Sequence, residues 1–312
     1  MEIGLAVPQY GRFARLSSVL RVAREAESMG LHSLWAGDRL LTPLTPKDRY
    51  PAGDGRIPEA HRVFLDPFAV LSVAASATST VRLGTSALNA CWYAPAVLAR
   101  SLTTIDHLSG GRLDAGLGLG WSSDEYAAAG VPWQGRARRY EATLDALEAI
   151  WTTDPVSYEH ELWTIAPSHI EPKPARRPPL YLAGFSEAAL RRIGRRGDGW
   201  LTAALPVPVL TSMWQTVCRT AEQAGRDPAG LRMILRSNPL ITEGGTPPRS
   251  GTVAEISAYL ATAAQAGVHE VILDLQHTAT SDEHLLDLAA AVRAELAELV
   301  GRSGEAPRAG LT

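Results

Sequence analysis

Apolar residues along this chain follow two alternating patterns. Short runs of adjacent apolar residues, typical of parallel strands buried on both faces, alternate with longer segments of helical period. The segment 13–29 is an example of a predicted helix, with Leu16, Val19 and Ala23 on one face and Gly30 ending it.

The two patterns together predict eight strands and eight helices in alternation. We expect strands at 2–7, 33–36, 81–88, 112–118, 180–184, 199–203, 231–241 and 270–275. We expect helices at 13–29, 66–78, 95–108, around 140–151, and at 186–195, 207–224, 253–266 and 282–300, with a small hairpin at 156–165. Such alternation predicts an α/β fold with a parallel sheet.

Eight strand–helix units close most simply into a (β/α)8 TIM barrel, although a doubly wound open sheet is an alternative. The pattern predicts one such domain over residues 1–300, with no linker inside it. The polar, glycine-rich tail 301–312 is expected to be disordered.

One long insertion follows the second strand. The segment Leu41 to Leu65 is rich in proline and glycine and shows no clear periodicity. In a barrel it would lie at the C-terminal end of the strands, where active sites are found. Because long irregular loops are uncommon unless functional, we interpret it as a substrate-covering loop.

Composition narrows the classes of protein. Apolar residues make up 46% of the 312 residues and charged residues 20%, which is typical of a soluble globular protein. A net charge of −3 gives no reason to expect nucleic-acid binding, and no run of 18 apolar residues predicts a membrane span. The chain opens on a strand pattern, so we expect no secretory signal.

Residue types that mark other chemistries are missing or scattered. Cys91 and Cys218 form neither a CxxC motif nor a disulfide framework, which favours a reducing, cytoplasmic setting. The histidines show no metal-ligand spacing, and no GxSxG motif is present. We therefore expect neither a metal site nor a serine hydrolase.

Candidate chemistry lies where the predicted strands end. Asp38 and Arg39 follow the second strand, where charged residues seldom serve packing, and a surface ion pair is the alternative. Strand three ends in small residues, including Ser86 and Ala87 before Asn89, which would let a planar ring approach the backbone or would simply pack tightly.

Two glycine-containing turns add to this end of the barrel. Gly118 and Gly120 precede Trp121, but Ser123 stands where a GxGxxG fingerprint needs its third glycine, so a Rossmann site is not predicted. The run Gly184, Phe185, Ser186 starts a helix, with Ser186 as a good N-cap. That turn would bind a phosphate or simply begin a helix. Trp92 and Arg236 would line a substrate pocket, with core packing and a surface charge as the alternatives.

Several segments together resemble the luciferase-like monooxygenase family, especially its coenzyme F-420-dependent branch. They span residues 1–200 in order: Leu34-Trp35 with Asp38-Arg39, Val81 to Ser86, Ile105 to Arg112, Gly116 to Trp121, Gly130 to Pro132, Lys173-Pro174 and Gly197 to Trp200. The Leu-Ser-Gly-Gly-Arg and Gly-Asp-Gly-Trp runs are specific in combination.

The resemblance implies a barrel oxidoreductase with a non-covalent flavin or deazaflavin, and frequent homodimers. It implies that Ser86-Ala87 forms a bulge, often with a cis peptide, behind the ring. Asp38, Asn89, Gly118 and Gly120 would contact the cofactor ring or chain, and Gly184, Phe185 and Ser186 would hold its phosphate.

The sequence departs from relatives at three positions. Arg39 stands where some relatives carry a catalytic His; it cannot serve as a general acid, but would stabilise an anionic ring. Trp121 stands where the sugar-phosphate dehydrogenases carry a catalytic Glu, which argues for a more apolar substrate. Phe185 replaces a glycine at the phosphate turn.

Three functions are compatible with this resemblance. The leading one is hydride transfer between coenzyme F-420 and a small apolar or conjugated organic substrate, favoured by the Asp38 and Asn89 pattern. The second is an FMN-dependent monooxygenase that receives reduced flavin from a separate reductase and uses O2. The third is a non-catalytic flavin-binding barrel.

Overall fold

A closed barrel of parallel strands lies at the centre of the computed structural model, which describes residues 1–304 and side chains as far as residue 299. Its strands are β1 (Glu2–Ala6), β2 (Ser33–Ala36), β3 (Arg82–Thr85), β4 (Leu88–Asn89), β5 (Leu113–Gly118), β8 (Leu180–Ala183), β9 (Gly199–Ala203), β10 (Arg232–Ser237) and β13 (Glu270–Leu273). The pairing of β3 with β5 closes the ring. Since β3 and β4 both pair with β5, they form one interrupted barrel strand, and the predicted eight-stranded barrel is confirmed.

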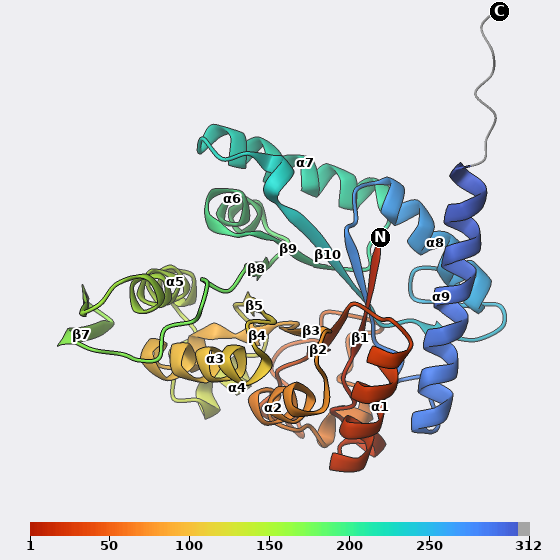
Figure 1. The fold of residues 1–312 in the computed structure, drawn as a ribbon, viewed down its shortest axis with the longest axis horizontal. Helices are drawn as coiled ribbons and strands as arrows, with labels where there is room; N and C mark the ends of the chain where they lie inside the picture. Colours follow the sequence, from red (N-terminus) through yellow and green to blue (C-terminus); the bar gives the residue numbers. More distant parts are fainter. Residues whose placement is uncertain (305–312) are drawn as a thin grey trace, which may run out of the picture.

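Helices surround this barrel (Figure 1). The outer helices are α1 (Leu16–Ser28), α2 (Pro67–Ala77), α3 (Pro95–Ser109), α5 (Arg136–Thr152), α6 (Glu187–Arg196), α7 (Val207–Gln223), α8 (Val253–Gln265) and α9 (Asp282–Gly304). The expected hairpin is present as β6 (Val156–His160) and β7 (Trp163–Ser168), which lie outside α5 in Figure 1. A short helix, α4 (Ser123–Ala128), was not expected.

Several predicted boundaries were wrong. Helix α1 begins at Leu16 because residues 11–13 form a 3-10 turn, and Leu16 itself is 60% exposed instead of packing on the core. The third strand breaks at Ser86–Ala87, and the seventh breaks after Ser237, where β11 (Leu240–Ile241) pairs instead with β12 (Ser250–Gly251).

The chain's end also differs from the expectation. Helix α9 continues to Gly304, so residues 301–304 of the expected tail belong to this helix. The rest of the expected disordered tail, 305–312, lies outside the described residues.

The interior of the barrel is filled around one tryptophan. Trp35 is fully buried and packs with Tyr181, Leu201, Ile234 and Ile272. Glycines make room for its ring, because a Cβ on Gly84 would lie 2.2 Å from the Trp35 Cε3 atom. Ala87 and Ala183 pack against this cluster and mark the level at which the filled interior ends.

An ion-pair network closes the N-terminal end of the barrel. Arg82 pairs with Asp114, Glu2 and the fully buried Glu270, and Arg232 joins Glu2 and Glu270 from β10. Pairing offsets part of the lost hydration of such charges, and here each of the five side chains, from five strands, lies next to at least one opposite charge. The N-terminal end is thus sealed, and open space is left at the opposite end.

Candidate functional site

A cavity of about 530 Å³ opens at the C-terminal ends of the barrel strands. Every residue predicted for the site lines it: Asp38, Arg39, Ser86, Ala87, Asn89, Trp92, Gly118, Gly120, Trp121, Gly184, Phe185, Ser186 and Arg236. The chain thus brings all predicted positions to one cavity, from strand ends that lie up to about two hundred residues apart in sequence. Their individual roles stay predictions.

Asp38 is a partly buried carboxyl group just after β2. Its Oδ2 atom accepts hydrogen bonds from the Asn89 backbone N–H at 3.0 Å and from the Tyr93 hydroxyl at 3.3 Å. Burial raises the pKa of Asp38 to about 7, even though these two hydrogen bonds act in the opposite direction. The alternative of a surface ion pair is therefore wrong for Asp38, which can exchange a proton near neutral pH.

The floor of the cavity is the peptide between Ser86 and Ala87. This peptide is cis, and it separates β3 from β4, so the bulge implied by the family resemblance is confirmed. The Arg236 guanidinium donates to the Ser86 carbonyl at 3.1 Å and also pairs with Asp274. Arg236 is therefore no free surface charge, because it holds the backbone behind the proposed ring site.

Asp274 and Tyr10 extend this network and were not predicted. The Tyr10 hydroxyl donates to Asp274 at 3.0 Å, and both side chains line the cavity. Although burial alone would raise it, the positive charge of Arg236 lowers the pKa of Asp274. The sequence pattern does not single out Asp274 because it extends strand eight to Leu275. The strand ends at Leu273, which puts Asp274 directly at a strand end.

Asn89 and Gly120 form a close contact on one wall. Gly120 has φ +69°, and a Cβ there would lie 2.1 Å from the Asn89 Nδ2 atom. A side chain at position 120 would therefore displace Asn89. At Gly118 a Cβ would only touch Ala183 at an ordinary 3.4 Å, so neighbouring protein atoms do not require that glycine.

The turn at Gly184 to Ser186 begins α6 as expected. The Ser186 hydroxyl accepts from the Ala189 N–H at 3.3 Å, and Gly184 has φ +153° with only 2.5 Å between an added Cβ and the Ala189 Cβ. The remaining first-turn N–H groups of a helix have no partner within the helix and suit an anion. The geometry fits a phosphate turn in which a glycine is structurally required.

Arg39 is buried beside an aromatic ring and a carboxylate. Its side chain is 5% exposed, its guanidinium lies 4.8 Å from the centre of the Trp121 ring, and its Nε lies 3.9 Å from Glu125 Oε1. Among the residues that the structure describes, Arg39 Nε and Nη2 have no hydrogen-bond partner. Glu125 instead accepts from the Leu40 backbone N–H at 2.8 Å.

The long loop after β2 covers this part of the cavity. Tyr50, Pro51, His61 and Phe64 line it, and the Tyr50 ring is perpendicular to Trp121 at 5.4 Å. Burial lowers the pKa of His61 to about 3, so its ring is neutral at physiological pH. These residues were missed because the loop carries no periodicity; only their position after a strand was a signal.

The loop is attached to α4. Asp48 accepts hydrogen bonds from the Ser123 N–H at 2.7 Å and hydroxyl at 2.6 Å, and the Lys47 N–H donates to Asp124 at 2.9 Å. The unpredicted helix α4 therefore serves as the anchor of the predicted covering loop.

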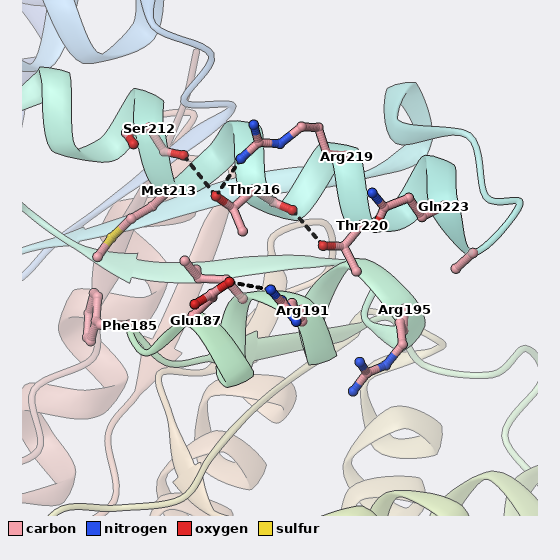
Figure 2. A pocket seen from close by; sticks show the side chains of 12 residues that line it. Phe185, Glu187, Arg191, Arg195, Ser212, Met213, Thr216, Arg219, Thr220 and Gln223 are labelled. Atoms are coloured by element: carbon pink, nitrogen blue, oxygen red, sulfur yellow. Dashed lines mark hydrogen bonds and ion pairs between the residues drawn. The ribbon is translucent and has the colours of Figure 1, made fainter.

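A second hollow of about 750 Å³ lies between α6 and α7, shown in Figure 2. Phe185 lines both this hollow and the main cavity, so the two meet at the turn before α6. Three arginines line it: Arg191, which pairs with Glu187, and Arg195 and Arg219. Within the described part of the chain, Arg195 and Arg219 have no acidic partner within 4.0 Å, and Arg219 donates to Thr216 at 3.3 Å.

Among the described residues, no group of three or more histidine, cysteine, aspartate or glutamate side chains is placed to hold a metal ion. No helix in residues 1–304 has the length and apolar character that crossing a membrane requires.

A (β/α)8 barrel with polar and titratable groups gathered in a cavity at the strand C-termini is the architecture of an enzyme. The luciferase-like monooxygenase family model matches residues 2–301, so the chain belongs to this family of enzymes. An uncharacterised protein of Mycobacterium tuberculosis is 31% identical over 270 residues, covering 83% of this chain and 88% of the relative. An F420-dependent glucose-6-phosphate dehydrogenase of Amycolatopsis mediterranei is 28% identical over 189 residues, 59% of this chain and 52% of that enzyme.

Solved structures share the fold at low identity. The monooxygenase RslO1 from Streptomyces bottropensis superposes with a TM-score of 0.79 at 20% identity, over 96% of this chain and 99% of the other. An F420-dependent secondary alcohol dehydrogenase bound to an F420–acetone adduct gives 0.75 at 17% identity, over 95% and 98%. A type II Baeyer–Villiger monooxygenase of Pseudomonas putida in complex with FMN gives 0.74 at 15%, over 96% and 98%.

Proposed function

We propose that this protein transfers a hydride between coenzyme F-420 and a small conjugated organic substrate. The observation that carries the proposal is a cavity that combines a place for a planar ring, at Ser86 and Ala87, with the partly buried acid Asp38. The similarity to an F420-dependent sugar-phosphate dehydrogenase supports the choice of cofactor.

The residues present fit a heterocyclic ring. Asn89 Nδ2 and Trp92 Nε1 line the cavity and have no hydrogen-bond partner among the described residues. Buried donors of this kind call for acceptor atoms, which a flavin or deazaflavin ring supplies along its edge. The close approach at Gly120 and the turn at Gly184 to Ser186 fit the ring's chain and phosphate.

Asp38 is the residue that would handle the proton. A hydride carries two electrons and one hydrogen nucleus, so net reduction of an organic molecule also needs a proton. With a pKa of about 7, Asp38 is part protonated at neutral pH and can give or take that proton. The bound cofactor supplies the hydride chemistry itself.

The hollow between α6 and α7 favours F-420 over FMN (Figure 2). It begins at Phe185, beside the proposed phosphate turn, and is lined by Arg195 and Arg219. Coenzyme F-420 carries further carboxylates beyond its phosphate, whereas FMN ends at the phosphate. A basic hollow leading away from the phosphate turn therefore suits the longer anionic cofactor.

Substrate class is indicated by the walls of the cavity. Trp121, Tyr50, His61 and Phe64 give an aromatic surface. By the family resemblance, Trp121 stands where sugar-phosphate dehydrogenases carry a catalytic Glu. A conjugated molecule packs on such rings better than a sugar phosphate does.

An FMN-dependent monooxygenase supplied by a separate reductase is the second candidate. The structural similarity to two monooxygenases is compatible with it. A homodimer, a cytoplasmic location and a single domain over 1–300 remain predictions, and size-exclusion chromatography with light scattering tests the first.

One anaerobic assay and one aerobic assay distinguish the candidate functions. Under nitrogen, reduced F-420 should be reoxidised in the presence of a panel of conjugated carbonyl compounds, and D38N should be at least tenfold slower. Oxygen uptake with reduced FMN that matches product formation would instead establish the monooxygenase. Tight cofactor binding without turnover in either assay would favour a flavin-binding barrel.

A further inference from the structure

The buried donors of Arg39 are unused by the protein. The side chain is 95% removed from solvent, yet its Nε and Nη2 atoms have no hydrogen-bond partner among the described residues, and the residue lines the cavity. Leaving buried charged donors without a hydrogen-bond partner destabilises the folded protein. Buried donors without a partner indicate that a ligand atom accepts their hydrogen bonds.

Glu125 does not satisfy this guanidinium. Its Oε1 atom lies 3.9 Å from Arg39 Nε, beyond hydrogen-bond distance, and accepts from the Leu40 N–H at 2.8 Å. The carboxylate therefore balances the charge of Arg39 while leaving its N–H groups free to donate. Because the pair is neutral overall, the missing partner does not need a full negative charge.

The surroundings of Arg39 are aromatic. Trp121 lies under the guanidinium at 4.8 Å, Tyr50 stands perpendicular to Trp121 at 5.4 Å, and His61 packs against Tyr50 at 5.7 Å. His61 Nδ1 is also buried without a hydrogen-bond partner in residues 1–304. Arg39 thus presents two unpaired N–H donors beside the aromatic rings of Trp121, Tyr50 and His61.

From this geometry we propose that Arg39 binds the carbonyl oxygen of a planar α,β-unsaturated carbonyl substrate and stabilises it as an enolate. This rests on the proposed function, in which reduced deazaflavin is the hydride donor. The hydride forms a C–H bond at the β-carbon, the C=C pair shifts towards the carbonyl carbon, and the carbonyl π pair moves to oxygen. The substrate is reduced, the deazaflavin is oxidised, and the enolate then takes one proton at its α-carbon from the protonated carboxyl group of Asp38.

Arg39 would stabilise the substrate most strongly while negative charge develops on the carbonyl oxygen. Two preset N–H donors in a site shielded from water stabilise a forming oxyanion more than the neutral carbonyl before it. Arg39 is thus assigned to the substrate oxygen and not to the cofactor ring, which differs from the role implied by the family resemblance.

A binding experiment with oxidised F-420 tests this without turnover. Calorimetry would compare benzylideneacetone, a planar enone, with phenylbutene, which has a similar skeleton but no oxygen, in the F-420-loaded wild type, R39M and R39K. We expect at least tenfold tighter binding of the enone by the wild type, no such preference in R39M, and a partial one in R39K. The enone absorption band should shift to longer wavelength in the wild type only.

Three outcomes would overturn the proposal. One is an absent preference for the enone in the wild type, and another is a preference that persists in R39M. The third is a loss of F-420 affinity greater than threefold in folded R39M and R39K, which would assign Arg39 to the cofactor. A separate titration of the wild type with F-420 tests the proposed function itself. Absence of F-420 binding in that titration would contradict the proposed function and not only the role of Arg39.

Discussion

Asp38 is the residue in which burial and chemistry are most directly linked. Its carboxyl group is held by the Asn89 N–H and the Tyr93 hydroxyl, and its pKa is raised to about 7 mainly by burial. An unfolded Asp titrates near 3.9. The folded protein therefore binds one more proton than the unfolded chain between about pH 4 and pH 7.

This difference predicts a pH-dependent effect of D38N. Because the folded state binds more protons in that window, the Asp38 contribution to stability is fully present below about pH 4 and is lost as pH rises through about 7. Asn accepts the same two hydrogen bonds but does not titrate. We expect the stability of D38N minus that of wild type to rise with pH by up to a few kcal/mol, at roughly 1.4 per pKa unit.

Urea unfolding of both proteins at pH 4.5, 6 and 8 would measure this. Parallel curves for D38N and wild type would show that Asp38 titrates as an ordinary exposed carboxyl group and would remove it as the proton-handling residue.

Gly120 offers a second test at the scale of one residue. In G120A the new Cβ would meet Asn89 Nδ2 at 2.1 Å, so the Asn89 side chain must move. We expect cofactor affinity to fall at least tenfold, beyond the ~1–2 kcal/mol stability cost of a left-handed alanine. G130A is a matched control, with φ +69° and no atom within 4 Å of its Cβ. Equal cofactor affinity in the two variants would contradict the assigned role.

At the scale of elements, the covering loop and α4 act as one unit. Asp48 accepts two hydrogen bonds from Ser123, which fixes residues of the loop to the first turn of the helix. The loop in turn carries Tyr50 and His61 over the cavity. The attachment should therefore matter more for the substrate than for the cofactor.

D48A tests this attachment. We expect KM for the substrate to rise about tenfold and proteolysis within 41–65 to accelerate, while cofactor affinity changes less than threefold. D48N keeps an acceptor and should recover part of the loss, and D54A, in the same loop but exposed, should leave KM unchanged. An equal loss of substrate and cofactor affinity would count against a covering loop.

The hollow between α6 and α7 gives a prediction about cofactor choice. In the double variant R195Q/R219Q, F-420 affinity should drop about tenfold and lose much of its dependence on salt, whereas FMN affinity should not change. R24Q, which removes an exposed arginine on α1, is the control. If F-420 binding is equally strong in the double variant, the hollow does not hold the cofactor.

For the whole molecule, periodicity was enough to predict the barrel but not its interruptions. A strand pattern such as 81–88 continues through Ser86 and Ala87 because both small residues fit a strand, while the backbone there turns through a cis peptide. Likewise Leu16 fits the helical stripe, but it is the first residue of α1 and is exposed. Such local geometry depends on contacts across the barrel that a one-dimensional pattern does not contain.

The candidate site was predictable wherever a residue directly follows a strand. Asp38, Asn89 and Gly184 lie at strand ends, so the barrel rule placed them correctly in the cavity. Residues from the loop, such as Tyr50 and His61, reach the cavity only through tertiary contacts with α4. The unpaired donors of Arg39 became visible only when its neighbours were known.

The central claim is that this barrel holds coenzyme F-420, and one measurement tests it most directly. Calorimetric titration of the purified apo-protein with F-420 and, separately, with FMN, each oxidised and reduced, compares all four ligands in one assay. The account predicts tight binding of F-420 with much weaker binding of FMN in either redox state. Selective binding of reduced FMN would contradict it in favour of a monooxygenase, and binding of neither would mean that the cavity is not a flavin or deazaflavin site.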